Sequence, residues 1–165
     1  MPEPTRMVVV NATPIIALAL IGKLDLLRRL YGQVAIPPAV WAEVIQGGAK
    51  GIGVTEIQTA EWIRVTMLAD PRRADLLSDL DRGEAEVLAL AQERHADLVV
   101  LDERLARRYA RRLNLKLTGT LGVLLRAKQQ GLVPAIKPLI EQLVQGGIRL
   151  SDDVIAKTLQ LAGEK

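Results

Sequence analysis

The chain has 165 residues, of which 49% are hydrophobic and 25% charged, and its formal net charge is +3. This length and composition predict one compact soluble domain and leave no room for a second full domain. The absence of cysteine excludes disulfides, thiol nucleophiles and thiolate metal sites, and it agrees with an expected cytoplasmic location. A single histidine, His95, argues against histidine triads and multi-histidine zinc sites.

The longest apolar run, Met7 to Ile21, is too short and too interrupted to cross a membrane. It falls below the ~18 residues that a spanning helix needs, and Asn11, Thr13 and Pro14 break it. We therefore expect neither a membrane anchor nor a signal peptide.

Short apolar segments alternate with helical patterns along the chain. Strands are predicted at Met7–Val10, Gln33–Ile36, Trp62–Met67, Leu98–Leu101 and Lys116–Thr118. Helices are predicted at Ile15–Leu20, Leu24–Tyr31, Pro37–Gln46, Val54–Ala60, Arg72–Leu80, Glu103–Leu113, Thr120–Gln130, Ile136–Gln145 and Asp152–Ala162, and a further apolar helix is opened by Glu84. This alternation predicts an α/β fold with a central parallel sheet and helices on both faces.

We divide the chain into a main domain, 1–133, and a C-terminal helical hairpin, 134–165, packed on it. The apolar faces of this hairpin must be covered either by the core or by another subunit, which leaves a homodimer open. The glycine-rich segment at 47–53 matches no phosphate-binding motif and is expected to be a flexible connection.

Polar residues occupy four positions that are expected to meet at one edge of the sheet. Asn11 and Asp102 directly follow predicted strands, and Glu43 and Glu84 lie on helices among apolar residues. Converging carboxylates bind hard divalent cations, and ligands sit at the carboxyl ends of parallel strands. Two structural alternatives stay open: Asp102 as the N-cap of the next helix, and Glu84 as the capping-box partner of Asp81.

The helix at Glu103–Leu113 is predicted to carry a strongly basic face. Its five arginines fall on one arc and its apolar residues on the other; the arginines are Arg104, Arg107, Arg108, Arg111 and Arg112. Residues 102–131 carry a net charge of +6 against +3 for the whole chain, so the remainder is −3. Segregated positive charge favours nucleic-acid binding through the phosphates, although a solvated helix face remains the alternative.

Four segments, in this order and at these spacings, resemble the PIN-like domains of an uncharacterised prokaryotic branch related to toxin nucleases. They are VVVNATPIIALALIGKLDLL, VAIPPAVWAEV, DRGEAEVLALA and ADLVVLDERLARRYARRLNLKLTGTLGVLLRAK. The resemblance covers nearly the whole chain. It implies a three-layer α/β/α fold and, for many members, a Mg²⁺- or Mn²⁺-dependent ribonuclease activity.

Carried over by position, the acidic residues of the family fall on Asn11, Glu43, Glu84 and Asp102, which would be both the catalytic and the metal-binding residues. Thr13 and Thr120 would be supporting polar residues near the metal. Asn11 departs from the pattern, because active nucleases of the family carry aspartate there. One negative charge is therefore missing from the predicted metal site.

The leading hypothesis is thus a metal-dependent endoribonuclease, whose possible role as a toxin would imply an antitoxin protein as a partner. The alternative is a PIN-like module that has lost turnover and binds nucleic acid or a partner protein.

Overall fold

A computed structural model of the protein describes residues 6–47 and 51–165 and contains a five-stranded parallel sheet with the order β3-β2-β1-β4-β5. The strands are β1 (Val8–Val10), β2 (Val34–Ile36), β3 (Ile63–Val65), β4 (Leu98–Val100) and β5 (Leu117–Thr118). Each predicted strand is present, and β3 lies at the edge of the sheet.

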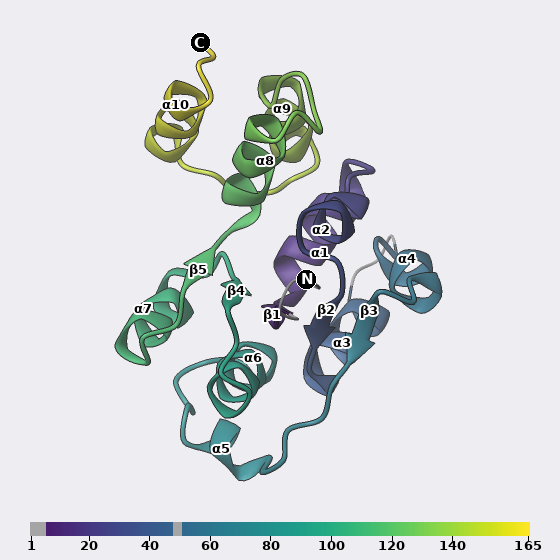
Figure 1. Ribbon diagram of the computed structural model, residues 1–165, viewed down its shortest axis with the longest axis vertical. Helices are drawn as coiled ribbons and strands as arrows, with labels where there is room; N and C mark the ends of the chain where they lie inside the picture. The colour runs from purple at the N-terminus through teal and green to yellow at the C-terminus, as the bar shows by residue number, and fades with distance from the viewer. Residues whose placement is uncertain (1–5, 48–50) are drawn as a thin grey trace, which may run out of the picture.

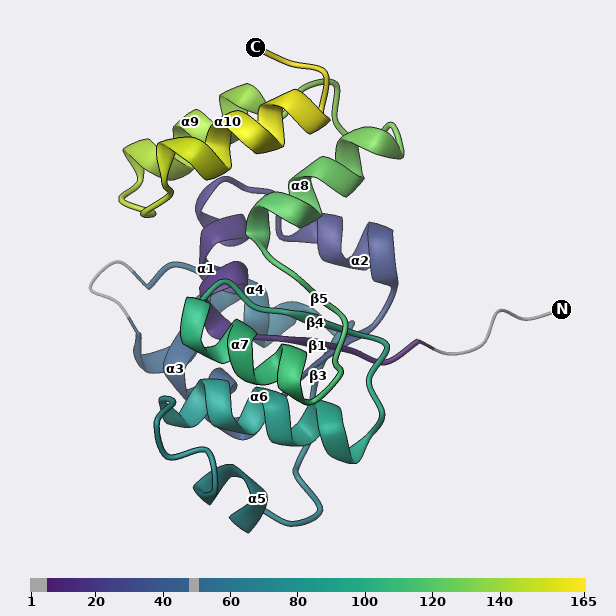
Figure 2. The ribbon, with the colours of Figure 1, turned by 90° about the vertical axis from the view of Figure 1, so that its left-hand side faces the viewer.

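Helices cover both faces of this sheet, as Figures 1 and 2 show. They are α1 (Ala12–Leu20), α2 (Asp25–Tyr31), α3 (Pro38–Gln46), α4 (Val54–Thr59), α5 (Arg72–Asp75), α6 (Arg82–Glu93), α7 (Arg104–Arg112), α8 (Thr120–Gln129), α9 (Lys137–Gln145) and α10 (Asp152–Leu161). In Figure 2, α2 and α8 lie above the strands and α5 and α6 below them. The predicted three-layer α/β/α fold is confirmed.

The central strands are apolar throughout because both of their faces are covered. Val8, Val9 and Val10 of β1 are fully buried, and α6 contacts both β1 and β4. The full register of β1 and β4 pairs Val8 with Leu98 and Val10 with Val100. Such continuous β-branched runs are typical of parallel strands inside a three-layer fold, where no face is left for polar residues.

The helix predicted at Arg72–Leu80 is shorter than expected. Helix α5 ends at Asp75, and the chain continues in turns through which Leu77 N–H donates to Ala74 O and Leu80 N–H to Leu77 O. Leu76 is 85% exposed in this segment, so a longer helix would gain little apolar burial to hold it together. The prediction was wrong because local periodicity carried no information about missing tertiary packing.

The C-terminal helices α9 and α10 lie together beside α8, above the rest of the sheet in Figure 2. One side of α9 and its N-cap is apolar and buried in the hydrophobic core. The buried residues are Ile136, Leu139, Ile140 and Leu143. Glu164 fastens the end of the chain, because its carboxylate accepts hydrogen bonds from Lys128 Nζ at 2.9 Å and from the backbone N–H of Ile136 at 2.9 Å.

Two remaining predictions concern regions outside these elements. The glycine-rich connection predicted at 47–53 falls partly on residues 48–50, which lie outside the described residues. Among the described helices, none has both the length and the apolar character that a membrane crossing requires.

Candidate active site

The candidate site lies where β1 and β4 end side by side at the carboxyl edge of the sheet. The backbone N–H of Asn11 donates to Val100 O at 3.0 Å, which holds Asn11 beside the end of β4. Asp102 follows the same strand after Leu101. Because β1 leads to β2 on one side of this pair and β4 leads to β5 on the other, this is the topological switch point, where α/β proteins bind ligands.

Asn11 presents a buried oxygen with which no described residue forms a hydrogen bond. Its side chain is 4% exposed, and Oδ1 accepts no hydrogen bond from any described residue. Gly83 in the first turn of α6 faces this oxygen: a Cβ placed on Gly83 would lie 3.8 Å from Asn11 Oδ1, 3.6 Å from Asp81 Oδ1 and 2.7 Å from Glu43 Oε1. Oxygens from the end of β1, from α3 and from the N-cap of α6 therefore surround one small space, which a glycine leaves open.

Glu84 is buried at the start of α6, with 7% exposure, and it forms the capping box that the sequence allowed. Its Oε1 accepts from the backbone N–H of Asp81 at 3.1 Å, while its own N–H donates to Asp81 Oδ1 at 2.8 Å. Burial raises the pKa of Glu84 to about 7, and the negative charges of Asp81 and Glu103 add to this effect.

Glu43 is the second acidic residue around this space whose pKa is raised. Burial, and next to it the charge of Asp81, also raises the pKa of Glu43. Within residues 6–47 and 51–165, no lysine or arginine forms an ion pair with Glu43, Asp81, Glu84 or Glu103. Among the described residues, no ion pair therefore offsets the negative charge that accumulates here.

Asp102 is held by Thr120, the first residue of α8. Its Oδ1 accepts from the backbone N–H of Thr120 at 2.7 Å and its Oδ2 from Thr120 Oγ1 at 2.6 Å. The N-cap of α7 is Glu103, whose side chain accepts from the backbone N–H of Ala106 at 3.0 Å. The alternative in which Asp102 caps α7 is therefore wrong, because the carboxylate turns towards β5 and α8 instead.

A metal fits this donor set, although not as a ready cage of carboxylates. In the described part of the chain, no three Asp, Glu, His or Cys side chains are grouped closely enough to hold a metal ion, so Glu43, Glu84 and Asp102 do not converge on one point. Instead, Glu43 and Asn11 meet with Asp81 around Gly83. An orphaned amide oxygen beside uncompensated carboxylates is the chemistry that a hard divalent cation satisfies.

A family model of the PIN domain matches residues 7–164, which is nearly the whole chain. The chain belongs to the PIN domain family. The resemblance seen in the four sequence segments is confirmed. No curated protein matches the chain. The PIN domain is a nuclease-type fold, which agrees with a site at this edge of the sheet.

Two residues at this candidate site were not among those predicted. Asp81 contributes an oxygen beside Gly83, and Glu103 lies near enough to raise the pKa of Glu84. Both lie close to predicted site residues in the sequence. Asp81 precedes Glu84 by three residues and was considered only as a helix cap, and Glu103 directly follows Asp102. Both residues could have been found from the sequence by treating every acidic residue close to a predicted site carboxylate as a further candidate.

A groove of about 710 Å³ leads away from this edge of the PIN domain. Thr13 and Asp102 line it together with Arg104 and Arg107 of α7 and Arg149 of the connection between α9 and α10. A lone arginine in a distant loop carries no local pattern, so sequence reasoning missed Arg149.

The basic face of α7 is only partly turned to this groove. Of its five predicted arginines, Arg104 and Arg107 line the groove, whereas Arg108, Arg111 and Arg112 do not. Arg112 instead stacks over the Tyr109 ring, 5.8 Å from its centroid. Arg107 is half-buried, and its guanidinium donates to Leu101 O at 2.6 Å, which fixes it beside Asp102.

Proposed function

We propose that this PIN domain protein is an endoribonuclease that depends on Mg²⁺ or Mn²⁺. The observation that carries the proposal is the unpartnered oxygen of Asn11, which meets the Glu43 and Asp81 carboxylates around Gly83. Amide and carboxylate oxygens are the ligands that these ions prefer. Asn11, Glu43 and Asp81 would hold the metal directly around Gly83. Glu84 and Asp102, which do not converge with Glu43 on one point, would complete the site through water bound to the ion.

The reaction would be hydrolysis of a phosphodiester at this edge of the sheet. A bound divalent cation supplies a water of lowered pKa and neutralises charge on the leaving oxygen. The protein's own part is positioning: Thr120 orients the Asp102 carboxylate through two hydrogen bonds, and Thr13 exposes a hydroxyl at the start of α1 in the same groove. This inventory needs neither a histidine nor a cysteine nucleophile.

RNA would enter along the groove that begins at Asp102. Arg104, Arg107 and Arg149 line the groove and would contact phosphates on either side of the cleaved bond. The +6 charge of residues 102–131, against +3 for the chain, strengthens this attraction through counterion release. Arg108, Arg111 and Arg112 would add longer-range attraction rather than contacts at the site.

The resemblance to toxin nucleases extends the proposal to a toxin of a toxin–antitoxin pair. Expression should then arrest growth, and Asp102→Asn should relieve the arrest. Growth unaffected by either form would remove this part of the proposal while leaving the ribonuclease itself to the assay below.

A second candidate function is a PIN domain that binds nucleic acid without turnover. It is favoured by Asn11, which supplies an amide where active members of the family carry a carboxylate, and by the absence of a three-carboxylate group among the described residues. Asn11→Asp tests this directly. The added charge should raise Mn²⁺ affinity and the cleavage rate if the other ligands work, and it should change neither if the site is dead.

The decisive assay follows cleavage of labelled single-stranded RNA with Mn²⁺ or Mg²⁺. Cleavage should stop in EDTA and fall by at least about tenfold in Asp102→Asn and Glu43→Gln, as expected for loss of groups that hold a metal. Glu61→Gln, at an exposed position remote from the site, is the matched control. Cleavage that persists in excess EDTA, or equal rates for Asp102→Asn and the control, would overturn the proposal.

A further inference from the structure

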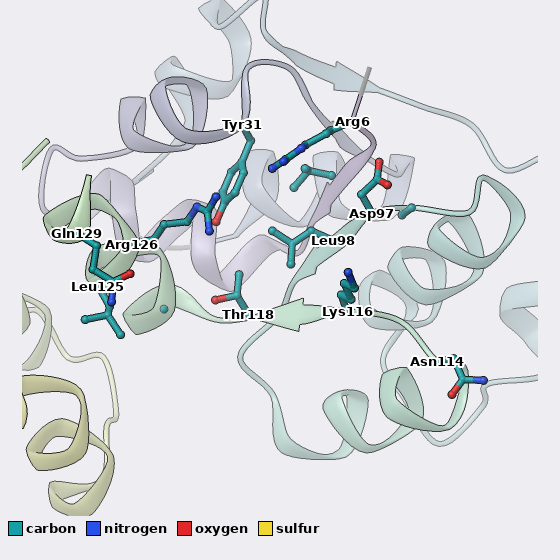
Figure 3. A pocket seen from close by; sticks show the side chains of 13 residues that line it. Arg6, Tyr31, Asp97, Leu98, Asn114, Lys116, Thr118, Leu125, Arg126 and Gln129 are labelled. Atoms are coloured by element: carbon teal, nitrogen blue, oxygen red, sulfur yellow. The ribbon is translucent and has the colours of Figure 1, made fainter. Parts of the chain in front are cut away.

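A second cavity, of about 720 Å³, lies on the sheet near the amino ends of β4 and β5 (Figure 3). Val8, Leu98 and Thr118 form its floor, and α8 lies along one side. Leu98 begins β4, whereas Asp102 follows its end, so the two positions are separated by about 13 Å at about 3.3 Å per residue. The cavity is therefore distinct from the candidate active site.

Three cationic side chains surround this cavity: Arg6 from the segment before β1, Lys116 before β5, and Arg126 from α8. Figure 3 shows Arg6 and Arg126 approaching Tyr31 from opposite sides. None of the three cations forms an ion pair or a side-chain hydrogen bond with any residue that the structure describes. No ion pair among the described residues thus offsets their mutual repulsion.

The one acidic residue in the lining does not neutralise them. Asp97 points its carboxylate at the backbone, where Oδ2 accepts from the N–H of Met7 at 2.8 Å. This hydrogen bond connects the segment before β4 to the segment before β1, which gives Asp97 a structural role. A net positive cavity remains.

Uncharged side chains in the lining could contact the other parts of an anionic ligand, including an aromatic ring. Tyr31 presents an aromatic ring and a hydroxyl, and Thr118 and Gln129 add a hydroxyl and an amide. Burial raises the pKa of Tyr31, while the nearby charges of Arg126 and Arg6 act in the opposite direction, which agrees with both guanidinium groups lying close to this side chain.

We infer that the cavity lined by Arg6, Lys116 and Arg126 is a second binding site, which takes the phosphate of a nucleotide. Guanidinium and ammonium groups are the preferred partners of phosphate oxygens, and Tyr31 offers a ring against which a base can stack. The volume also falls within the range of about 300–1,000 Å³ that small-ligand sites occupy.

The phosphate has two possible sources with the same chemistry. Gly122 lines both this cavity and the groove beside Asp102, so an RNA strand bound at the candidate active site has a route into the second site. A free mononucleotide is the other source. Binding at this cavity requires no metal and no cleavage, so the inference stands apart from the proposed ribonuclease activity.

The test measures binding in EDTA, so that neither metal nor cleavage contributes. The probes are AMP and a single-stranded RNA of about ten nucleotides, a length within the usual range for single-strand binding sites. The variant is Lys116→Glu with Arg126→Glu, and its control is Arg64→Glu, an exposed arginine on β3 at the opposite edge of the sheet. Lys116→Gln with Arg126→Gln serves if the charge reversal disturbs folding, and Lys116→Arg should retain binding.

We expect the double variant to weaken binding of at least one probe by about tenfold or more at low salt, with a shallower salt dependence, whereas Arg64→Glu changes it little. Loss for AMP and RNA identifies a mononucleotide pocket, and loss for RNA alone identifies an extension of the RNA path. Equal affinities of the double variant and Arg64→Glu for both probes, or binding of neither probe to the unaltered protein, would overturn the inference. An unaltered protein that binds here but cleaves nothing would refute the ribonuclease proposal alone.

Discussion

Substituting Gly83 by alanine should stabilise the fold and impair the metal site at the same time. Gly83 is the second residue of α6, where alanine is favoured over glycine by less than the about 0.5–1 kcal/mol of a helix interior. The added Cβ would stand 2.7 Å from Glu43 Oε1, closer than van der Waals contact allows. The atom in the way is the end of the Glu43 side chain, whose carboxylate is partly buried although the residue as a whole is exposed. Rotation of this side chain would move the carboxylate aside, so the fold tolerates the methyl group while the metal loses a ligand position.

Thermal unfolding should show both effects of Gly83→Ala: an equal or higher stability without metal and a smaller stabilisation by Mn²⁺. For a chain of this size, 1 kcal/mol corresponds to about 2–4 °C in the melting temperature. Mn²⁺ at about 100 times its dissociation constant should stabilise the unaltered protein by about 2.7 kcal/mol. If Gly83→Ala weakens Mn²⁺ binding tenfold, the same concentration stabilises the variant by only about 1.4 kcal/mol.

Thermal unfolding with EDTA and with increasing Mn²⁺ measures both quantities. Gly83→Ala should melt at the same or a higher temperature in EDTA, yet gain about half as much from Mn²⁺. Gln92→Ala, on the exposed side of the same helix, should leave the Mn²⁺ response unchanged. An unchanged response in Gly83→Ala would refute the reasoning that the space beside Gly83 belongs to the metal site.

Two further predictions test contacts around the fold. Thr120→Val removes the 2.6 Å hydrogen bond to Asp102 and should lower the free energy of unfolding in urea by about 1 kcal/mol, since water can hydrate the exposed carboxylate instead. It should also lower any RNA cleavage. Thr120→Ser retains the hydroxyl and should preserve both the stability and the cleavage. Glu164 has a pKa lowered to about 2 from the usual 4.5, chiefly by its hydrogen bond from Lys128. Its contribution to stability is therefore complete above about pH 4.5 and disappears as the pH falls towards about 2. Glu164→Gln should reduce the urea midpoint at pH 7 and converge with the unaltered protein in acid; the exposed Glu141→Gln should show no such convergence, and a difference for Glu164→Gln that does not depend on pH would contradict this account.

Local patterns in the sequence were sufficient to predict the layers of the fold and the positions of two residues of the candidate site, Asn11 and Asp102. Val8–Val10 and Leu98–Val100 are apolar without interruption, which indicated strands buried on both faces. The segregated arginines of α7 predicted a helix with one packed side, on which Ala106 and Ala110 are indeed buried. Because parallel strands end at the same edge of a sheet, the sequence predicted that Asn11 and Asp102 lie at one edge. The strand order of the structure, in which β1 pairs with β4, then makes them neighbours.

Tertiary packing decided which polar atoms meet and which are left without partners. The unpartnered Oδ1 of Asn11 depends on the close approach of α3 and α6, and the N-cap of α7 fell on Glu103 because Thr120 takes both oxygens of Asp102. Arg149 joins the groove only because the connection between α9 and α10 folds back towards α7. The second cavity gathers Arg6 and Arg126 from segments 120 residues apart in the numbering of the chain. Periodicity reports how one element divides between core and solvent, whereas these contacts depend on how several elements are placed relative to each other.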